Sequence, residues 1–175
     1  MDAHADGTIP AEAFARFVDA RQQALQRTAW LLTGDWALAE DLVQTALARS
    51  WPRWERIRRR DDPEIYVRRV MVNTWSTWYR RKSRGERPSG IVLDRAAPSD
   101  VAAEVTIRLA VRGALGVLTD RQRAVVVLRL FDDLSEAQVA QVLGCPVGTV
   151  KSQLSRALAR LRADPALSEV MEGAR

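Results

Sequence analysis

Apolar residues recur every three or four positions along most of this 175-residue chain, as Leu38, Leu42 and Ala46 do. That spacing places the apolar side chains on one face of an α-helix. The alternation typical of a β-strand persists nowhere for more than a few residues. The pattern predicts an all-α protein built from two small helical domains joined by a flexible linker.

Capping residues and helix breakers divide this pattern. Thr33-Gly34-Asp35 predicts a helix stop followed by an N-cap, Pro52 predicts the end of the next helix, and Asp62-Pro63 predicts the start of a longer one. Glycine, proline and serine cluster after Ser83, which predicts a flexible, slightly acidic linker. The expected organisation is a first domain over 1–84, the linker over 85–100, a second domain over 101–168 and a tail over 169–175.

The composition excludes several classes of protein. The single cysteine, Cys145, has no internal disulfide partner, and with the single histidine, His4, it cannot form a zinc site. We therefore expect no metal, no cofactor and no catalytic residue. There is no apolar run of about 18 residues and no signal-peptide pattern in the polar first ten residues, so we expect a cytoplasmic protein without membrane insertion.

Basic residues concentrate in two stretches. Residues 49–84 hold 12 basic and 4 acidic side chains, and residues 121–162 hold 7 and 3, within a total net charge of +5. Arginine outnumbers lysine 25 to 2, and its planar donors suit phosphates and guanine edges. Genomic base composition is the alternative explanation for so much arginine. The distribution nevertheless favours two contact points on one polyanion.

The second basic stretch contains a helix-turn-helix pattern. Ser135 caps a short amphipathic segment, Gly144-Cys145-Pro146 breaks it, and the next helix has a stripe of Val147, Val150, Leu154, Leu158 and Leu161. Such a helix pair also occurs as plain packing in bundles. The outer face of the helix after Pro146 carries no carboxylate, however, and this favours DNA binding. Its residues are Thr149, Lys151, Ser152, Gln153, Ser155, Arg156 and Arg160.

The helix predicted from Asp62 to Arg84 has two distinct faces. One carries Val67, Met71, Trp75 and Trp78 and is expected to be core. The other is polar and suits a nucleic-acid backbone or unpaired bases, although a merely solvated face would look similar. Asn73 points to a function there because asparagine is a poor residue for the middle of a helix. The polar face consists of Arg69, Asn73, Ser76, Arg80 and Arg84.

The connector predicted over residues 51–61 mixes tryptophan with arginine. Trp51 and Trp54, interleaved with Arg56 and its basic neighbours, could stack on splayed bases or could be core residues, and for Trp51 we favour the core. The preceding helix differs, because it presents polar and acidic side chains that would attract a basic protein rather than DNA. These side chains are Glu40, Asp41 and Gln44.

Three segments together resemble bacterial extracytoplasmic-function (ECF) RNA polymerase sigma factors of the sigma-70 family. They are AEDLVQTALARSW (39–51), YVRRVMVNTWSTWYRR (66–81) and LTDRQRAVVVLRLFDDLSEAQVAQVLGCPVGTVKSQLSRALARLR (118–162). The similarity is greatest to the SigE-like actinobacterial group. It extends over about residues 11–165 and keeps the order of the family's segments.

The resemblance implies a promoter-specificity subunit of RNA polymerase. The first domain would bind the clamp of the β′ subunit through Glu40, Asp41 and Gln44. It would open the −10 element with Arg69, Asn73, Ser76, Arg80, Trp54 and Arg56. The second domain would rest on the β flap and read the −35 element with Thr149, Lys151, Ser152, Ser155 and Arg156, helped by phosphate contacts from Arg121 and Arg123. An anti-sigma factor is a further possible partner, although no residue demands one.

Other functions account for less of the pattern. A stand-alone helix-turn-helix regulator would not need the polar stripe on the helix over 62–84. A nucleic-acid enzyme would need a catalytic site, and the sequence offers no carboxylate cluster with metal-binding spacing and no glycine-rich phosphate loop. A pure interaction bundle would explain the helices but not the face from Thr149 to Arg160.

Overall fold

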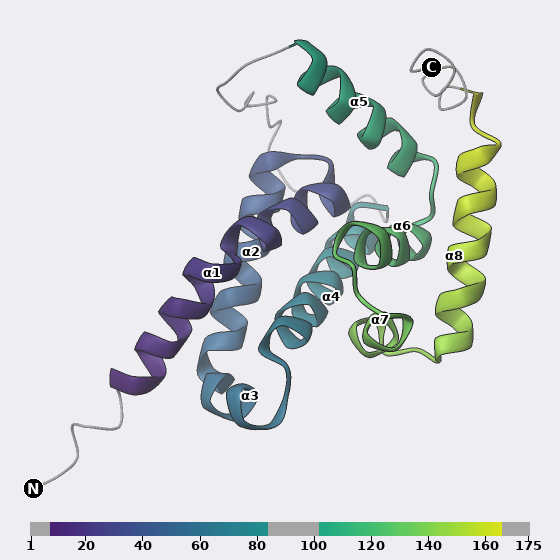
Figure 1. The fold of residues 1–175 in the computed structure, drawn as a ribbon. Helices are drawn as coiled ribbons and strands as arrows, with labels where there is room; N and C mark the ends of the chain where they lie inside the picture. Colours follow the sequence, from purple (N-terminus) through teal and green to yellow (C-terminus); the bar gives the residue numbers. More distant parts are fainter. Residues whose placement is uncertain (1–7, 84–101, 166–175) are drawn as a thin grey trace, which may run out of the picture.

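The structure is a computed structural model that describes residues 8–83 and 102–165. Every regular element in those ranges is helical, which confirms the all-α prediction. In chain order they are α1 (Thr8–Thr33), α2 (Trp36–Ser50), a 3₁₀ turn (Trp51–Arg53), α3 (Trp54–Arg60), α4 (Pro63–Ser83), α5 (Ala102–Gly116), α6 (Asp120–Val126), a π turn (Val127–Phe131), α7 (Glu136–Leu143) and α8 (Val147–Arg162), as Figure 1 shows. The predicted linker over 85–100 and the tail over 169–175 lie outside the described residues.

The predicted breaks of the first unit are confirmed. Gly34 has a φ of +71°, a left-handed conformation that ends α1 and that glycine adopts without steric cost. The Asp35 carboxylate then accepts from the Leu38 N–H at 2.9 Å and caps α2. Asp62 does the same for α4, accepting from the Glu64 N–H at 2.9 Å.

The core of the first unit lies where α1, α2 and α4 meet. Leu25, Leu42, Met71 and Trp75 are all at most 1% exposed, and they come from the three helices in turn. Burying each such side chain contributes about 2 kcal/mol. The predicted core face of α4 is therefore confirmed at Met71 and Trp75, and it fixes which side of α4 faces outward.

The segment after α2 is helical, not the irregular connector that we expected. The 3₁₀ turn contains Pro52 and leads directly into α3, which closes the end of the core with Ile57. The turn also decides the roles of the two tryptophans. Trp51 is 44% exposed and Trp54 only 3%, so our preference for Trp51 as the core residue was wrong.

The second unit is built around a helix-turn-helix, as predicted. Thr119 and Ser135 each form a capping box, with the side chain of the glutamine three residues later returning to the cap N–H. Gly144 has a φ of +62° and turns the chain between α7 and α8. Val139 and Val150 are fully buried between these helices.

A wide turn separates α6 from α7. The Asp132 N–H donates to the Val127 carbonyl at 3.1 Å, five residues back, which is the pairing of a π turn. Asp133 follows with a φ of +54°. The turn buries Val127 but leaves Leu130 and Phe131 half-exposed, at 50% and 41%.

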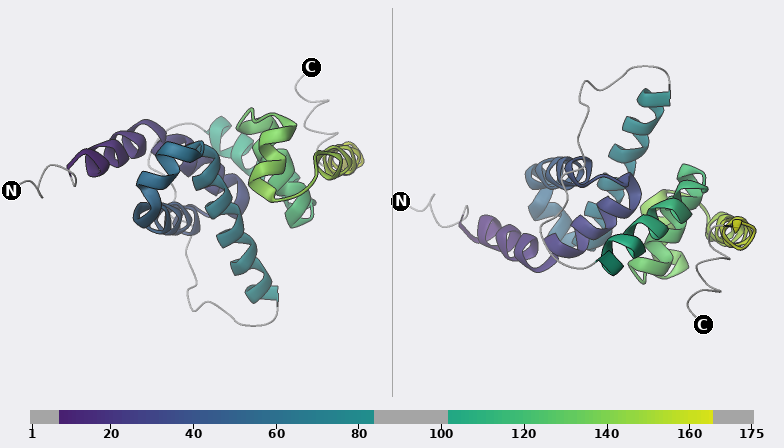
Figure 2. Two further views of the ribbon diagram at one scale, coloured as in Figure 1. Left: turned by 90° about the horizontal axis from the view of Figure 1, so that it is seen from below. Right: turned by 90° about the horizontal axis from the view of Figure 1, so that it is seen from above.

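The two units pack against each other. Helix α7 lies on α4, and the π turn lies against α1. Both views in Figure 2 place α8 beyond α6 and α7, on the side away from α1 and α2. This arrangement brings residues from distant parts of the sequence into one interface, which the prediction of two linked domains did not include.

Candidate nucleic-acid interface

Helix α8 presents a polar face on the outside of the second unit. Val150 and Ala157 hold the helix against the core and are fully buried, whereas Lys151, Ser155 and Arg156 are exposed. Thr149 and Ser152 are half-buried on the same outer side. The helix contains no Asp or Glu, so the face it offers is basic or neutral throughout.

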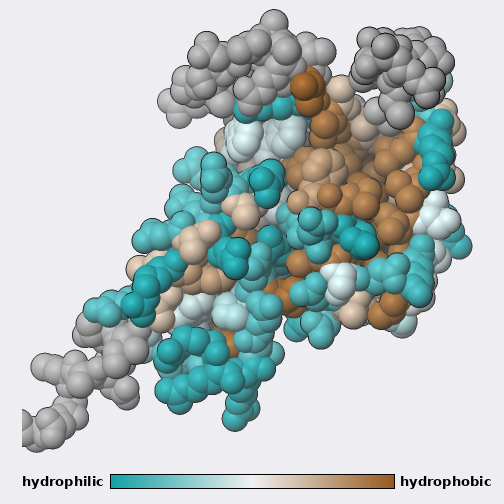
Figure 3. All heavy atoms as spheres, viewed as in Figure 1, coloured by the Kyte–Doolittle hydropathy of each residue, from teal (hydrophilic) through white to brown (hydrophobic). Residues whose placement is uncertain are grey.

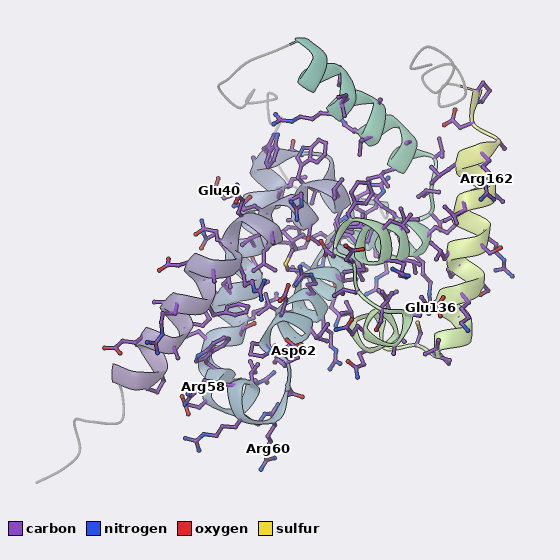
Figure 4. The ribbon with its side chains drawn as sticks, viewed as in Figure 1. Glu40, Arg58, Arg60, Asp62, Glu136 and Arg162 are labelled. Atoms are coloured by element: carbon purple, nitrogen blue, oxygen red, sulfur yellow. The ribbon has the colours of Figure 1, made fainter. Side chains whose placement is uncertain are left out.

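An ion pair brings an acidic side chain of α7 to α8. Glu136, labelled in Figure 4 near the start of α7, lies with its Oε2 3.7 Å from the Lys151 Nζ. Both groups are substantially exposed, so the pair is worth little, and Lys151 can exchange it for another anion.

The outer face of α4 is also basic, but part of it is covered. Asn73 and Arg80 are exposed and Ser76 is half-buried, on the side opposite Met71. Arg69 is exposed too, yet its Nε donates to the Gln141 carbonyl of α7 at 3.0 Å. Arg84, the last residue of the predicted stripe, lies outside the described residues. The other four residues lie on one side of α4, and the second unit touches that side at Arg69.

Helix α3 carries a further row of exposed arginines. Arg58 and Arg60 point away from the fold in Figure 4, and Arg56 is exposed as well. Glu55 pairs with Arg58 at 3.1 Å and with Arg59 at 3.0 Å, which offsets part of the positive charge. Arg56 has no such carboxylate neighbour among the ion pairs of the described residues.

The structure corrects the prediction that Trp54 binds DNA. The Trp54 ring packs edge-on against the Phe14 ring and lies tilted against the Phe17 ring, with 5.0 Å between the ring centroids in each pair. At 3% exposure it offers no face to a base. Trp54 is a core residue because the 3₁₀ turn rotates it inward, and Trp51 is the tryptophan that remains accessible.

The acidic face of α2 lies apart from these basic surfaces. Glu40, Asp41 and Gln44 are all exposed, and their spacing places them on one side of the helix. Gln44 also borders a shallow hollow of about 340 Å³ that is lined mainly by apolar side chains, among them Phe14 and Trp51. A charged rim beside an apolar hollow is typical of a protein-binding surface.

The two arginines predicted to contact phosphates at the start of α6 differ sharply. Arg121 is exposed. Arg123 is buried: its Nε donates to the Leu115 carbonyl and its Nη1 to the Leu32 carbonyl, each at 3.0 Å, and the guanidinium lies 5.9 Å from the Tyr79 ring centroid. Arg123 is thus a structural residue, and the prediction that it contacts a phosphate was wrong.

Sequence reasoning missed a buried ionic cluster between the units. Arg68 donates from Nε to the Asp132 carboxylate at 2.8 Å and also pairs with Glu64, and the Thr28 hydroxyl donates to Asp132 at 2.7 Å. Burial alone would lower the pKa of the Arg68 guanidinium, but the charges and hydrogen bonds of Asp132 and Glu64 raise it above its ordinary value. The sequence did offer one signal that Arg68 is buried. Arg68 follows the apolar Ile65 by three positions and so lies on the same helix face, and Ile65 is 6% exposed.

Comparisons with known proteins identify the family. Residues 17–85 match the Sigma-70 region 2 family, and residues 108–161 match the Sigma-70, region 4 family. The ECF RNA polymerase sigma factor SigL of Mycobacterium tuberculosis is 32% identical over 167 residues, which span 91% of this chain and 94% of that protein. The RNA polymerase sigma-E factor of Streptomyces coelicolor is 43% identical over 149 residues, 85% of this chain and 84% of that protein. The chain belongs to the ECF sigma factors.

Membership confirms the predicted function. An ECF sigma factor is a transcription initiation factor that binds core RNA polymerase and directs it to promoter DNA, so the alternative of a stand-alone regulator is set aside. The basic faces of α4 and α8 lie within the two matched regions. None of the described helices is long and apolar enough to cross a lipid bilayer.

Solved structures support the fold of this sigma factor. The sigma factor RpoE from Bartonella quintana, crystallised with the anti-sigma factor NepR, superposes with a TM-score of 0.71 at 24% identity and covers 87% of this chain and 96% of its own. CnrH, in complex with the cytosolic domain of CnrY, gives a TM-score of 0.64 at 24% identity and covers 87% of each chain. At this identity the likeness concerns the fold alone.

Proposed function

We propose that α8 reads the −35 promoter element in the major groove. The observation that carries this proposal is the exposed, carboxylate-free face of α8, held outward by the buried Val150 and Ala157. Arginine and lysine suit guanine edges, while serine and threonine reach bases or phosphates. The contributing residues would be Thr149, Lys151, Ser152, Ser155 and Arg156, with Arg121 on a neighbouring phosphate.

The outer face of α4, together with α3, is our candidate for the −10 element. Arg69, Ser76 and Arg80 supply donors for the backbone, and Asn73 has an amide that can pair with a base edge. Arg56 extends the same surface from α3. Opening the duplex costs unstacking energy, which contacts of this kind on a single strand offset in part.

Core polymerase would bind elsewhere on the same unit. Glu40, Asp41 and Gln44 on α2 form an acidic face that suits a basic partner, which we assign to the β′ clamp. A polymerase-bound protein can then place α4 and α8 on two DNA elements at once. The second contact would form at high effective concentration once the first is made.

Apolar side chains gather between α5 and α8, as the brown area of Figure 3 shows. Leu109 and Val117 are 58% and 42% exposed on α5 and in the turn that follows it. We assign this surface to the β flap. An anti-sigma factor, the kind of partner that RpoE from Bartonella quintana holds, would compete for such exposed apolar side chains. The cytoplasm, where polymerase acts, is the proposed location, and we assign the chain no catalytic step.

Run-off transcription tests these assignments. Sigma-free core polymerase, the purified protein and candidate promoters should give protein-dependent initiation at a defined start site. Arg156→Ala should lower transcription from promoters that depend on the −35 element, whereas Arg16→Ala removes an exposed arginine from α1 and should not. Equal transcription by the Arg156→Ala variant and the wild type would contradict the role of α8.

A further inference from the structure

Glu136 is the first residue of α7, and its carboxylate approaches α8. Its Oε2 lies 3.7 Å from the Lys151 Nζ, and Figure 4 labels it between α7 and the first half of α8. Both side chains remain open to solvent, at 36% for Glu136 and 64% for Lys151. A carboxylate therefore stands beside a lysine on the face that we assign to the −35 element.

The fold keeps these two residues at a fixed spacing. Ser135 forms a capping box that sets the start of α7, directly before Glu136. Val139 and Val150, both fully buried, pack α7 against α8. An acidic side chain also suits the first turn of a helix, where the helix dipole is positive. The backbones of Glu136 and Lys151 are thus held by packed helices, so any change in the pair is a movement of the side chains.

Another exposed cation of the same face, Arg156, lacks such a neighbour. No ion pair engages Arg156 within the part of the chain that the structure describes, and α8 itself contains no Asp or Glu. Arg156 can therefore take either a phosphate or a base edge. Lys151 differs because a carboxylate already stands beside its ammonium.

A carboxylate next to an ammonium changes which acceptors the ammonium can serve. An ammonium has three donors, so Lys151 can keep Glu136 and still donate to a further acceptor. The N7 and O6 atoms of guanine are neutral acceptors that a neighbouring carboxylate tolerates. A phosphate is anionic, so Glu136 repels it or must be displaced by it. The pair thus favours a base edge over the DNA backbone.

We propose that Glu136 determines specificity in this sigma factor: it weakens the hold of Lys151 on phosphates of any sequence and so reserves that ammonium for a base edge of the −35 element. Glu136 acts through Lys151 and is therefore a positioning residue. A repulsive element directed against the wrong site is a general route to specificity. The base-edge part rests on the proposed function of α8, whereas the weakened hold on phosphates does not.

The first test compares Glu136→Gln with Asp133→Asn, which removes the same charge from an exposed position of the same unit. Asparagine tolerates the φ of +54° at position 133. Fluorescence anisotropy of the full chain with a short duplex of scrambled sequence, over a salt series, measures binding to phosphates. Glu136→Gln should bind about threefold more tightly, and its log affinity should fall more steeply with log salt, by about 0.9 for one added phosphate. Asp133→Asn should keep the wild-type slope.

Holoenzyme then measures the consequence for promoters. Polymerase carrying each variant is bound to a promoter fragment found by run-off transcription and to the same fragment with a scrambled −35 element. Glu136→Gln should lower the ratio of the two affinities about threefold, because the scrambled fragment gains affinity and the intact one does not.

The possible outcomes separate the parts of the proposal. An unchanged salt slope in Glu136→Gln would overturn it. A steeper slope with an unchanged ratio would overturn the base-edge part and leave the weakened hold on phosphates standing. Equal transcription by Arg156→Ala and the wild type would instead contradict the proposed function of α8, without touching the effect on phosphates.

Lys151→Met shows whether Glu136 acts through Lys151. The ammonium that would gain a phosphate is gone in this background, so adding Glu136→Gln should leave the salt slope unchanged. An equal steepening in both backgrounds would indicate general electrostatics and overturn the pairing. Glu136→Asp keeps the carboxylate and should keep the wild-type slope. A slope as steep as that of Glu136→Gln would count against a role of this charge.

Discussion

The Arg123 Nη1 donates to the carbonyl oxygen of Leu32 at 3.0 Å and so joins the start of α6 to the end of α1. Carbonyls in the last turn of a helix have no partner within it, and they carry partial negative charge. The same guanidinium satisfies the Leu115 carbonyl at the end of α5. One side chain thus completes the ends of two helices.

Arg123→Met should lower the free energy of unfolding by about 2 kcal/mol, because two buried carbonyls lose a charged donor. Urea denaturation followed by circular dichroism measures this. Arg121→Met is the matched control: that arginine is exposed, and its replacement should change stability by no more than about 0.5 kcal/mol. Equal losses in the two variants would show that net charge, not the buried hydrogen bonds, is responsible.

Gly144→Ala should weaken both stability and use of the −35 element. A left-handed alanine costs about 1–2 kcal/mol, and relief of that strain would turn α8 relative to α7. A Cβ at Gly144 meets nothing within 4 Å, so the cost is conformational rather than a clash.

Gly148→Ala is its control. A Cβ at Gly148 also meets nothing within 4 Å, but that residue lies in the first turn of α8 with an ordinary φ. This change should leave the melting temperature equal or slightly higher. If Gly148→Ala lowered it as much as Gly144→Ala, the left-handed conformation would not be the cause.

Asn73→Ala should reduce discrimination between consensus and mutated −10 elements about tenfold, because an amide that reads a base edge contributes about 1–3 kcal/mol. Run-off transcription from paired promoters measures the ratio, and binding to core polymerase should stay unchanged. Gln23→Ala, an exposed amide on α1, should keep wild-type discrimination. An unchanged ratio in Asn73→Ala would contradict the assignment of α4.

Asp41→Ala should lower the affinity for core polymerase about tenfold, the effect of one well-placed interface residue. Fluorescence anisotropy of labelled protein titrated with core enzyme gives the dissociation constant. Asp19→Ala removes an exposed carboxylate from α1 and should leave that constant unchanged. A similar loss in both variants would indicate general electrostatic attraction rather than a docking site on α2.

Local patterns in the sequence predicted most of the fold. The caps at Asp35 and Ser135 and the left-handed Gly144 follow from residue chemistry over a few positions, and the structure confirms each. The core face of α4 follows from helical spacing in the same way. The outward faces of α4 and α8 were predictable for the same reason, because a helix that buries one side exposes the other.

The contacts between the units could not be predicted from such patterns. Arg68 and Asp132 are 64 positions apart, and nothing in the residues around either one indicates the other. Trp51 and Trp54 were assigned the wrong way round because a 3₁₀ turn of three residues intervenes and changes the helical phase. Arg123 was taken for a DNA contact because an arginine in a basic stretch looks the same whether its partner is a phosphate or a buried carbonyl.

The π turn over Val127–Phe131 bears on how such a protein can change between relatives. A π turn accommodates one residue more than a regular helical turn. Because the turn absorbs its extra residue locally, deletion of a single codon there would restore a regular helical turn and leave the following chain in about the same orientation. Asp132, the residue directly after the turn, would then keep its contacts with Arg68 and Thr28. The contacts between the two units could thus survive a one-residue change of chain length among relatives at this place.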